Sequence, residues 1–477
     1  MSDNLRQKTK NGLIWSTVEN FSTQGVSFIF SIILARLLCP SDYGIVAMTG
    51  IFFSIARAFV ESGFGSALIR KKDRKDIDFS TCFYFNMVVS LFFYVIFFIS
   101  APMIASFYDQ PILISIVRVE ALNIIFGAFC IVQQSKLTIE IDFKTQAKIS
   151  LSSIIISGII GILFAYLDYG VWALVWQGIS SSIMYSIMLC VFVRWRPRCG
   201  FSKESFHYLF GYGSKLLASG LLDTTYNNIY PLVIGKFYTP AQLGNFSRAQ
   251  SFAQLPSSNI TRVLQRVTFP VLSEIQDDME RLETNYRKLL KMSAFIIFPL
   301  MMGLAAVANP LINVVLTAKW EQCVIYLQIF CFSMMWYPIH AINLNLLQVK
   351  GRSDLFLRLE IIKKIVGACI MCVTIPMGVL FMCYGMVVSS LISLIINTYY
   401  TGKLIKVGYI VQMKDLLPIF LCSVLMGVIV FFCIQYIFNY WLQLIIGILI
   451  GICCYIGFTY IFAKEELLEC KMFIKNK

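Results

Sequence analysis

The sequence predicts an all-α polytopic membrane protein, and three observations support this fold class. The 477 residues are 58% hydrophobic and 14% charged, with a mean hydropathy of +0.74, whereas an ordinary soluble domain has about 25% charged residues. The apolar residues fall into blocks of about 20 or more, which is long enough for a helix to cross the hydrocarbon core. The cations gather in short clusters between these blocks.

The apolar blocks predict about fourteen membrane spans with short connections. The first follows a polar, basic N-terminal segment without an early Ala-x-Ala cleavage pattern, so we expect a retained span and not a removed signal peptide. If the last hairpin does not cross, twelve spans remain. The expected spans are 12–36, 42–66, 81–106, 112–134, 147–168, 171–193, 209–235, 241–267, 286–308, 322–347, 357–379, 382–402, 416–437 and 441–462.

Most of the 40 Lys and Arg residues lie in alternate connecting segments, in the order expected if both termini are cytoplasmic. The net charge of +14 therefore reflects membrane topology. Because no basic stripe is interleaved with aromatic residues on a soluble face, we do not expect nucleic acid as a partner.

A ten-residue turn organises the chain and recurs 200 positions later. Ala35–Gly44 and Gly235–Gly244 both read small residue, cation, three residues, Pro, three residues, Gly. Proline ends one helix and is tolerated at the start of the next. We therefore predict two pseudo-symmetric six-helix bundles, 1–200 and 201–406. A terminal hairpin with a cytoplasmic tail, 407–477, follows them. An even number of spans per repeat gives both copies the same orientation in the membrane.

The helices flanking both turns carry polar residues on one face, because steps of three and four keep side chains together on a helix. The first pair presents Glu19, Thr23 and Ser27, then Gly50, Ser54, Arg57 and Glu61. The second pair presents, at the same offsets, Ser219, Asp223 and Asn227, then Gln250, Gln254, Ser257 and Thr261.

Charged side chains inside a bilayer cost about 2.5–3.5 kcal/mol or more and normally face a cavity or a partner. Arg57 and Glu61 either neutralise each other at i,i+4 or serve the lumen. Arg36 and Lys236 stand at span ends, where they either snorkel to the headgroups or act inside. Arg118, Lys215 and Arg248 are further candidates for the interior. The polar spans also place Tyr226, Asn227, Gln250 and Gln254 as candidate cavity-lining groups.

Catalytic and metal-binding patterns are weak in this sequence. Of the two histidines, we expect His207 to be solvated and His340 to be a core or cavity-lining residue rather than a proton relay. Cys369 and Cys372 have metal or redox spacing but lie mid-span without a nearby histidine, so we expect a buried structural pair and no metal site. We also expect no ATP site and no enzyme activity.

Three motifs in about the first 75 residues resemble the polysaccharide and O-antigen (lipopolysaccharide) exporters of the multidrug/oligosaccharidyl-lipid/polysaccharide (MOP) flippase superfamily. The similarity is diffuse over the remainder. The motifs are Gly12-Leu13-Ile14-Trp15; Ala35-Arg36-Leu37-Leu38 with Pro40-Ser41-Asp42-Tyr43-Gly44; and Glu61-Ser62-Gly63-Phe64-Gly65-Ser66-Ala67-Leu68-Ile69.

The resemblance implies a flippase that moves an undecaprenyl-diphosphate-linked oligosaccharide across the bacterial cytoplasmic (inner) membrane by alternating access. It implies a cationic lumen for the diphosphate, for which we choose Arg57, Arg118, Lys215 and Arg248 by their positions in the helices. We expect no cofactor. An H⁺ or Na⁺ gradient, or downhill substrate flux, would give direction, with Glu19, Glu61 and Asp223 as candidate ion sites. Membrane lipids and glycan assembly enzymes are the expected partners.

Other readings stay open at this stage. A flippase for the peptidoglycan precursor lipid also has fourteen spans, although the exporter-type motifs argue against it. A drug or cation antiporter should carry fewer cations in its lumen. A membrane-embedded glycan polymerase or ligase should show a large periplasmic loop with Arg and His, and a docking protein would have little need for polar stripes in both halves.

Overall fold

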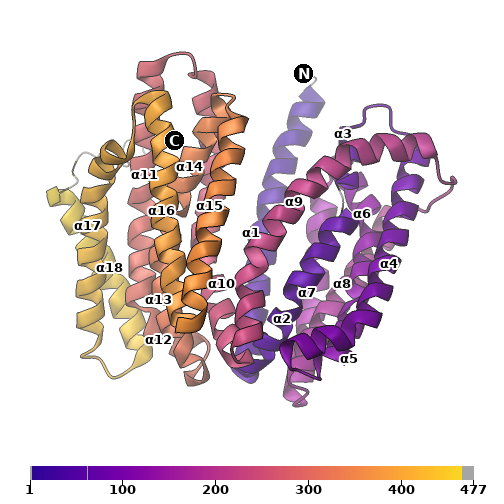
Figure 1. The fold of residues 1–477 in the computed structure, drawn as a ribbon, viewed down its shortest axis with the longest axis horizontal. Helices are drawn as coiled ribbons and strands as arrows, with labels where there is room; N and C mark the ends of the chain where they lie inside the picture. The colour runs from indigo at the N-terminus through magenta and orange to yellow at the C-terminus, as the bar shows by residue number, and fades with distance from the viewer. Residues whose placement is uncertain (1–2, 62, 463, 465–477) are drawn as a thin grey trace. The chain divides into compact units, whose positions relative to one another are not determined.

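The computed structural model describes the backbone of residues 3–61, 63–462 and 464, and the side chains of these residues except 3–11, 13, 219 and 267. Within this range the chain is helical, and no strand occurs (Figure 1). The contacts divide it into two compact units, Met1–Gly244 and Asn245–Lys477. The bundles predicted from the sequence, with bounds at 200 and 406, stay a prediction.

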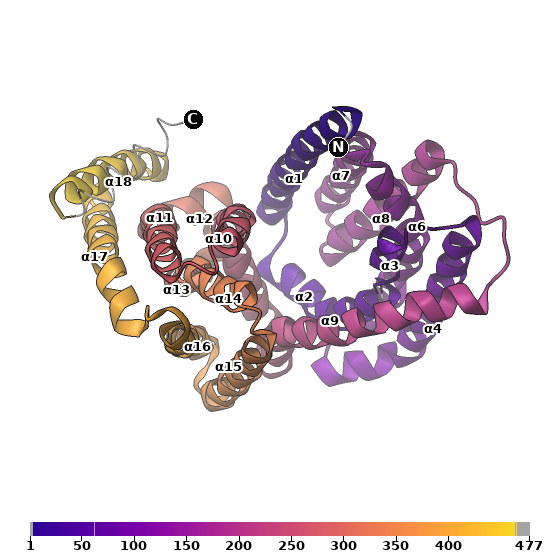
Figure 2. The ribbon, with the colours of Figure 1, turned by 90° about the horizontal axis from the view of Figure 1, so that it is seen from above.

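The first unit consists of helices that pack mainly on helices distant in sequence, with α7 and α8, and α4 and α5, as the main adjacent pairs. Figure 2 shows α1 beside α7 and α7 beside α8, and the long α9 packs against α2, α3 and α4. The helices are α1 (Asp3–Leu37), α2 (Pro40–Glu61), α3 (Phe64–Arg70), α4 (Asp76–Tyr108), α5 (Leu113–Glu120), α6 (Leu122–Glu140), α7 (Phe143–Tyr166), α8 (Val171–Val193) and α9 (Lys203–Phe237).

The second unit is built around α11, which contacts α13, α14 and α17, while α18 covers α17 and α12 (Figure 1). Helix α10 begins five residues before the division between the units. The elements are α10 (Pro240–Glu274), α11 (Met279–Ala306), α12 (Ala308–Val315), η1 (Ala318–Trp320), α13 (Glu321–Met334), α14 (Tyr337–Val349), α15 (Ser353–Thr374), η2 (Ile375–Met377), α16 (Val379–Ile405), α17 (Tyr409–Ile434) and α18 (Tyr440–Phe462).

Eleven segments of the described chain are long and apolar enough to cross a membrane, which confirms a multi-pass membrane protein. Three other long helices, α9, α10 and α15, overlap the predicted spans 209–235, 241–267 and 357–379. They fall outside the eleven because they carry more polar and charged residues. Helices α9 and α10 are two of the four helices for which the sequence predicts a polar stripe, the others being α1 and α2.

The two repeated turns are closed by equivalent hydrogen bonds. The Cys39 amide donates to Asp42 Oδ2 at 2.9 Å, and the Thr239 amide, 200 residues later, donates to Gln242 Oε1 at 3.2 Å. The backbone amides one position earlier, at Leu38 and Tyr238, both donate to the carbonyl four residues before them. The same turn geometry is therefore built twice, with an amide oxygen replacing a carboxylate oxygen.

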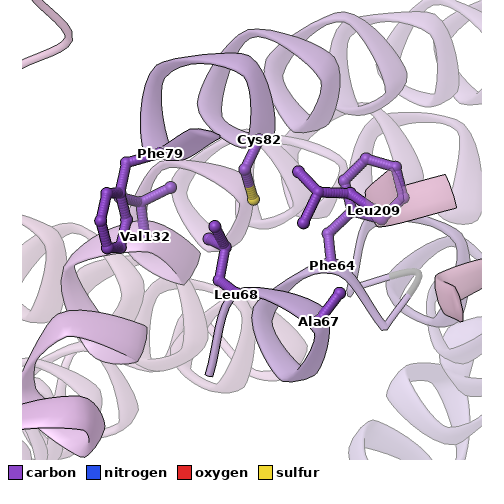
Figure 3. Close-up of a cluster of buried hydrophobic side chains, with 7 residues drawn as sticks. All are labelled: Phe64, Ala67, Leu68, Phe79, Cys82, Val132 and Leu209. Atoms are coloured by element: carbon purple, nitrogen blue, oxygen red, sulfur yellow. The ribbon is translucent and has the colours of Figure 1, made fainter. Parts of the chain in front are cut away.

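A buried apolar cluster anchors the short helix α3 (Figure 3). Phe64 and Leu68 of α3 point toward Cys82 of α4 and Leu209 of α9, and all four side chains are inaccessible to solvent. Burying such a side chain contributes about 1.5–3 kcal/mol. The cluster holds α3 in place against α4, α6 and α9 directly after α2 ends. Its members are Phe64, Ala67, Leu68, Phe79, Cys82, Val132 and Leu209.

The expectation that Cys369 and Cys372 form a buried pair is wrong. Both side chains are exposed on α15, and every described cysteine is free. In a membrane helix an apolar residue does not need a protein partner, since lipid covers it as well as a core does.

Candidate functional site

A polar cavity of about 650 Å³ lies within the first unit. It is a half-open cavity lined by α2, α3, α6 and α8, with Leu216 of α9 at one side. Its polar lining combines one cation and one acid with hydroxyl and amide groups. These polar residues are Arg57, Glu61, Ser66, Asn123, Gln134, Ser135, Thr138, Ser181, Ser182 and Tyr185. A polar volume inside a bundle of apolar helices is costly unless it holds water or a polar ligand.

The exporter-like segment Glu61–Ile69 builds one wall of this cavity. Helix α2 ends at Glu61, and Gly63 takes a left-handed conformation, with φ of +69°, before α3 begins. A Cβ at Gly63 would lie 3.0 Å from the Gly213 Cα and 3.1 Å from Leu216. Glycine is therefore required both by the backbone angle and by the close approach of α9. Ser62 of this motif lies outside the described residues.

Arg57 points into the cavity from α2, with its side chain exposed there, one helical turn before Glu61. The i,i+4 spacing allows an ion pair between them, but among the described residues none forms within 4 Å. The acid that acts on Arg57 from another helix is Glu120 of α5. Thr49 donates a hydrogen bond of 2.8 Å to Glu120 Oε2. Arg57 is thus available at the cavity surface, and Glu120 interacts with it electrostatically.

Glu19 lies next to this cavity rather than in its lining. Ser150 of α7 donates to Glu19 Oε1 at 3.2 Å, and the same serine hydrogen bonds to Tyr185, which lines the cavity. Thr23 donates back to the Glu19 carbonyl at 2.6 Å, so this part of the predicted stripe is satisfied within α1.

The other predicted residues of the first unit stand outside the cavity lining. Arg118 stacks over the Phe98 ring, with 4.4 Å from Cζ to the centroid, and donates Nε to the Phe98 carbonyl at 3.3 Å. Lys215, Asp223 and Asn227 are exposed on α9, and Tyr226 is half-buried there. The Ser219 side chain is not among those described. Arg36 is exposed at the end of α1, and Lys236 pairs with Asp109 at 3.2 Å.

In the second unit, the polar residues of α10 fall into two groups, one at least partly exposed and one buried. Arg248 lies 5.8 Å from the centroid of the buried Trp320, Gln250 is half-buried and Gln254 is exposed. Ser257 and Thr261 are buried. Ser257 donates to the Met334 carbonyl at 2.8 Å, and Thr261 donates to the Ser257 carbonyl at 2.7 Å. Part of the predicted stripe therefore fixes α10 onto its own unit.

Sequence reasoning identified Arg57 and Glu61 but missed Glu120 as the acid next to Arg57. Glu120 stands out in the sequence as an intramembrane acid, yet the helical spacing rule pairs residues only within one helix. No group of three or more His, Cys, Asp or Glu side chains that could hold a metal occurs in the described part of the chain. The roles of the candidate residues stay predictions.

Several proteins of similar sequence are named as polysaccharide biosynthesis proteins. The teichuronic acid biosynthesis protein TuaB of Bacillus subtilis is 23% identical over 90% of this chain and 89% of its own length. The succinoglycan biosynthesis transport protein ExoT of Rhizobium meliloti is 25% identical, over 66% of this chain and 64% of its own length.

Among solved structures, the lipid II flippase MurJ in an inward closed conformation has a similar fold. The TM-score is 0.76 at 16% identity, over 95% of this chain and all of that one. At this identity the similarity establishes the fold alone. The profile of the polysaccharide biosynthesis protein family matches residues 33–325, which include both repeated turns and every residue that lines the cavity. This chain therefore belongs to the polysaccharide biosynthesis protein family.

Proposed function

We propose that this protein is a flippase that carries an undecaprenyl-diphosphate-linked oligosaccharide, the repeat unit of an O-antigen, capsule or exopolysaccharide, across the cytoplasmic membrane. The observation that carries the proposal is the polar cavity in the first unit. Its wall is the segment that resembles polysaccharide exporters, and its cation is Arg57. The fold shared with a lipid II flippase and the kinship with polysaccharide biosynthesis proteins support the same function.

The chemistry of such a substrate suits this lining. A lipid-linked diphosphate crosses hydrocarbon very slowly because both the charges and the sugar hydroxyls lose their water. Arg57 would pair with diphosphate oxygens, for which the planar guanidinium is well shaped. Side chains such as Gln134, Ser181 and Ser182 would hydrogen bond the sugars. The prenyl tail would stay in lipid between helices.

We extend the proposal to the other candidates in the same terms. Arg118, Lys215 and Arg248 would meet the headgroup at other stages of transport, and Glu19, Glu61 and Asp223 would bind a coupling ion. Tyr226, Asn227, Gln250 and Gln254 would line the path. The protein would act without a cofactor or catalysis of its own, in the inner membrane with both termini cytoplasmic. Glycan assembly enzymes would supply its substrate and use its product.

The test is a charge scan in a strain whose own copy of this gene is deleted. Arg57→Ala, Arg118→Ala, Lys215→Ala and Arg248→Ala are compared for surface glycan at equal membrane abundance. Arg57→Ala is expected to lower export at least tenfold. Normal export by all four variants would refute the proposal that cations in the lumen bind the diphosphate. Rescue of a strain lacking its peptidoglycan precursor flippase would favour the second candidate, which shares the diphosphate.

A further inference from the structure

The segment that joins α8 to α9 presents three arginines on one side. It is not helical, and from Arg194 onward the exposure alternates from one residue to the next. Arg194, Arg196 and Arg198 are exposed, whereas Trp195 and Pro197 between them are half-buried. Successive side chains of an extended chain point to opposite sides. The three guanidinium groups therefore share one outward-facing side, and the tryptophan faces the protein.

The packing of Trp195 fixes this orientation. Its ring lies at the edge of the buried α3 cluster, with its centroid 5.8 Å from that of Phe83 and 6.5 Å from that of Phe79. Lys136 of α6 completes the contact, with its ammonium nitrogen 5.8 Å from the Trp195 centroid and 5.1 Å from the Phe79 centroid. The inner side of the segment is thus occupied by protein, which leaves the arginine side open to a partner.

A second basic segment, the turn between α3 and α4, lies beside the first. The Ser202 amide donates to Thr81 Oγ1 at 3.1 Å, and the Cys199 amide donates to Ser80 Oγ at 3.4 Å. These hydrogen bonds join the segment before α9 to the first turns of α4, where the turn after α3 ends. Two parts of the sequence about 120 positions apart therefore form one surface.

This surface has an excess of positive charge. Residues 70–78 and 194–204 together contain nine Lys and Arg residues but four Asp and Glu residues. Asp78 is buried and paired with Lys71 at 2.7 Å, and the other three acids are exposed among the cations. We call the following exposed side chains the basic edge: Lys72, Lys75, Arg194, Arg196, Arg198 and Lys203.

The basic edge lies at the level of the lipid headgroups. One candidate membrane span ends at Val193, directly before the first arginine, and another begins at Asp76, directly after Lys75. Phe192 and Phe201, on either side of the arginines in the sequence, are 54% and 51% exposed. Cations beside exposed aromatic rings at the ends of spans are typical of the membrane interface. The apolar rings favour a lipid over a soluble acidic partner.

We propose that the basic edge is a binding site for the headgroups of anionic phospholipids. The planar guanidinium groups pair with phosphate oxygens, and the acyl chains lie along Phe192 and the end of α8. Because the arginine segment leads into α9 at Ser202, a bound lipid holds the start of that helix against α4. The site is separate from the cavity that contains Arg57, and lipid binding here does not depend on the proposed transport function.

The first experiment titrates phosphatidylglycerol with a fluorescent acyl chain into the full-length protein in a nonionic detergent. The triple variant Arg194→Gln, Arg196→Gln and Arg198→Gln should bind this lipid at least tenfold more weakly than the wild type, because three charge-assisted contacts to phosphate are lost. All three side chains are exposed, so the variant should keep the gel-filtration profile of the wild type. An unchanged affinity overturns the proposal.

The control removes the same charge from three exposed lysines of the second unit, in the triple variant Lys403→Gln, Lys406→Gln and Lys414→Gln. Its affinity for phosphatidylglycerol should stay within twofold of the wild type. Equal losses in the two triple variants would show that binding follows net charge alone, and would refute a site at the basic edge.

The second experiment identifies the ligand with the wild-type protein, so it needs no substitution. Phosphatidylcholine, which has no net charge, should bind at least tenfold more weakly than phosphatidylglycerol. Inorganic phosphate at matched ionic strength should not displace the lipid, because it lacks the acyl chains. Equal binding of the two lipids, or displacement by inorganic phosphate, overturns the proposal. Displacement by tenfold less undecaprenyl diphosphate would also overturn it and assign the basic edge to substrate capture.

Discussion

Gly44 approaches Pro240 so closely that a Cβ on Gly44 would lie 1.8 Å from the Pro240 carbonyl oxygen. The contact is reciprocal, because a Cβ on Gly244 would lie 1.8 Å from the Pro40 carbonyl oxygen. Each turn therefore inserts its glycine against the proline of the other. Two copies of one motif therefore make the same contact with each other in both directions.

This contact predicts that the two glycines cannot be replaced. Gly44→Ala or Gly244→Ala would force backbone atoms apart, and overpacking of this kind typically costs about 1–3 kcal/mol or more. We expect loss of folded protein in detergent, measured by fluorescence-detected gel filtration after heating. Gly50→Ala, in the same helix as Gly44, has no neighbour within 4 Å and serves as the matched control. It should be neutral or stabilising by about 1 kcal/mol or less. If Gly44→Ala and Gly244→Ala melted at the same temperature as Gly50→Ala, the close contact between the turns would be contradicted.

The C-terminal hairpin should depend on one ion pair. Arg287 of α11 forms two hydrogen bonds of 2.7 Å to Asp415 of α17, whose side chain is 8% exposed. Asp415→Ala should cost on the order of 1–2 kcal/mol, because a paired charge-assisted contact is lost and Arg287 is left partly buried. Thermal unfolding in detergent measures the change.

The control for the hairpin is Asp354→Ala. The hydrogen bond from Arg352 lowers the pKa of Asp354 to about 2, yet both side chains are exposed at the surface. Exposed ion pairs contribute little to stability, so this variant should melt as wild type does. A loss as large as that of Asp415→Ala would show that the Arg287 pair has no special part in holding α17.

Glu120 should set how tightly the cavity holds an acidic ligand. When ionised, Glu120 offsets part of the charge of Arg57, so Glu120→Gln should increase the attraction between Arg57 and a diphosphate. We expect tighter binding of undecaprenyl diphosphate, by about threefold to tenfold, with slower export because release is delayed. Binding to the purified protein and export in cells are measured together. Glu140→Gln, at the far end of α6, is the control. Weaker binding in Glu120→Gln would contradict this role.

The proposed orientation can be tested with two native cysteines. Cys39 is exposed in the turn after α1 and Cys199 is partly exposed between α8 and α9. With a cytoplasmic N-terminus, α1 ends on the periplasmic side. A variant that keeps only Cys39 should therefore react with an impermeant maleimide in intact spheroplasts, and one that keeps only Cys199 should react only after permeabilisation. The reverse pattern would invert the topology.

The fold could largely be predicted from the sequence because membrane helices are recognisable by their length, their apolar composition and the cations that flank them. The repeated turn was also visible, through Pro40, Gly44 and their partners 200 residues later. The exposure of Cys369 was not, since an apolar pattern does not tell a core from a lipid-facing surface.

The candidate site was only partly predictable. Arg57 and Glu61 emerged from their polar stripe, and the structure places both in one cavity. The neighbouring Glu120 and the partner of Arg118, Phe98, depend on contacts between helices that no single-chain periodicity encodes.

The most direct measurement is lipid translocation by the purified protein in vesicles, with undecaprenyl-diphosphate-linked oligosaccharide from the source bacterium placed in one leaflet. A sugar-oxidising reagent outside the vesicles reports how much lipid has crossed. We expect the wild-type protein to accelerate crossing at least tenfold over empty vesicles, and Arg57→Ala to lose most of that acceleration. A wild-type rate equal to that of empty vesicles, or full activity of Arg57→Ala, would contradict the account.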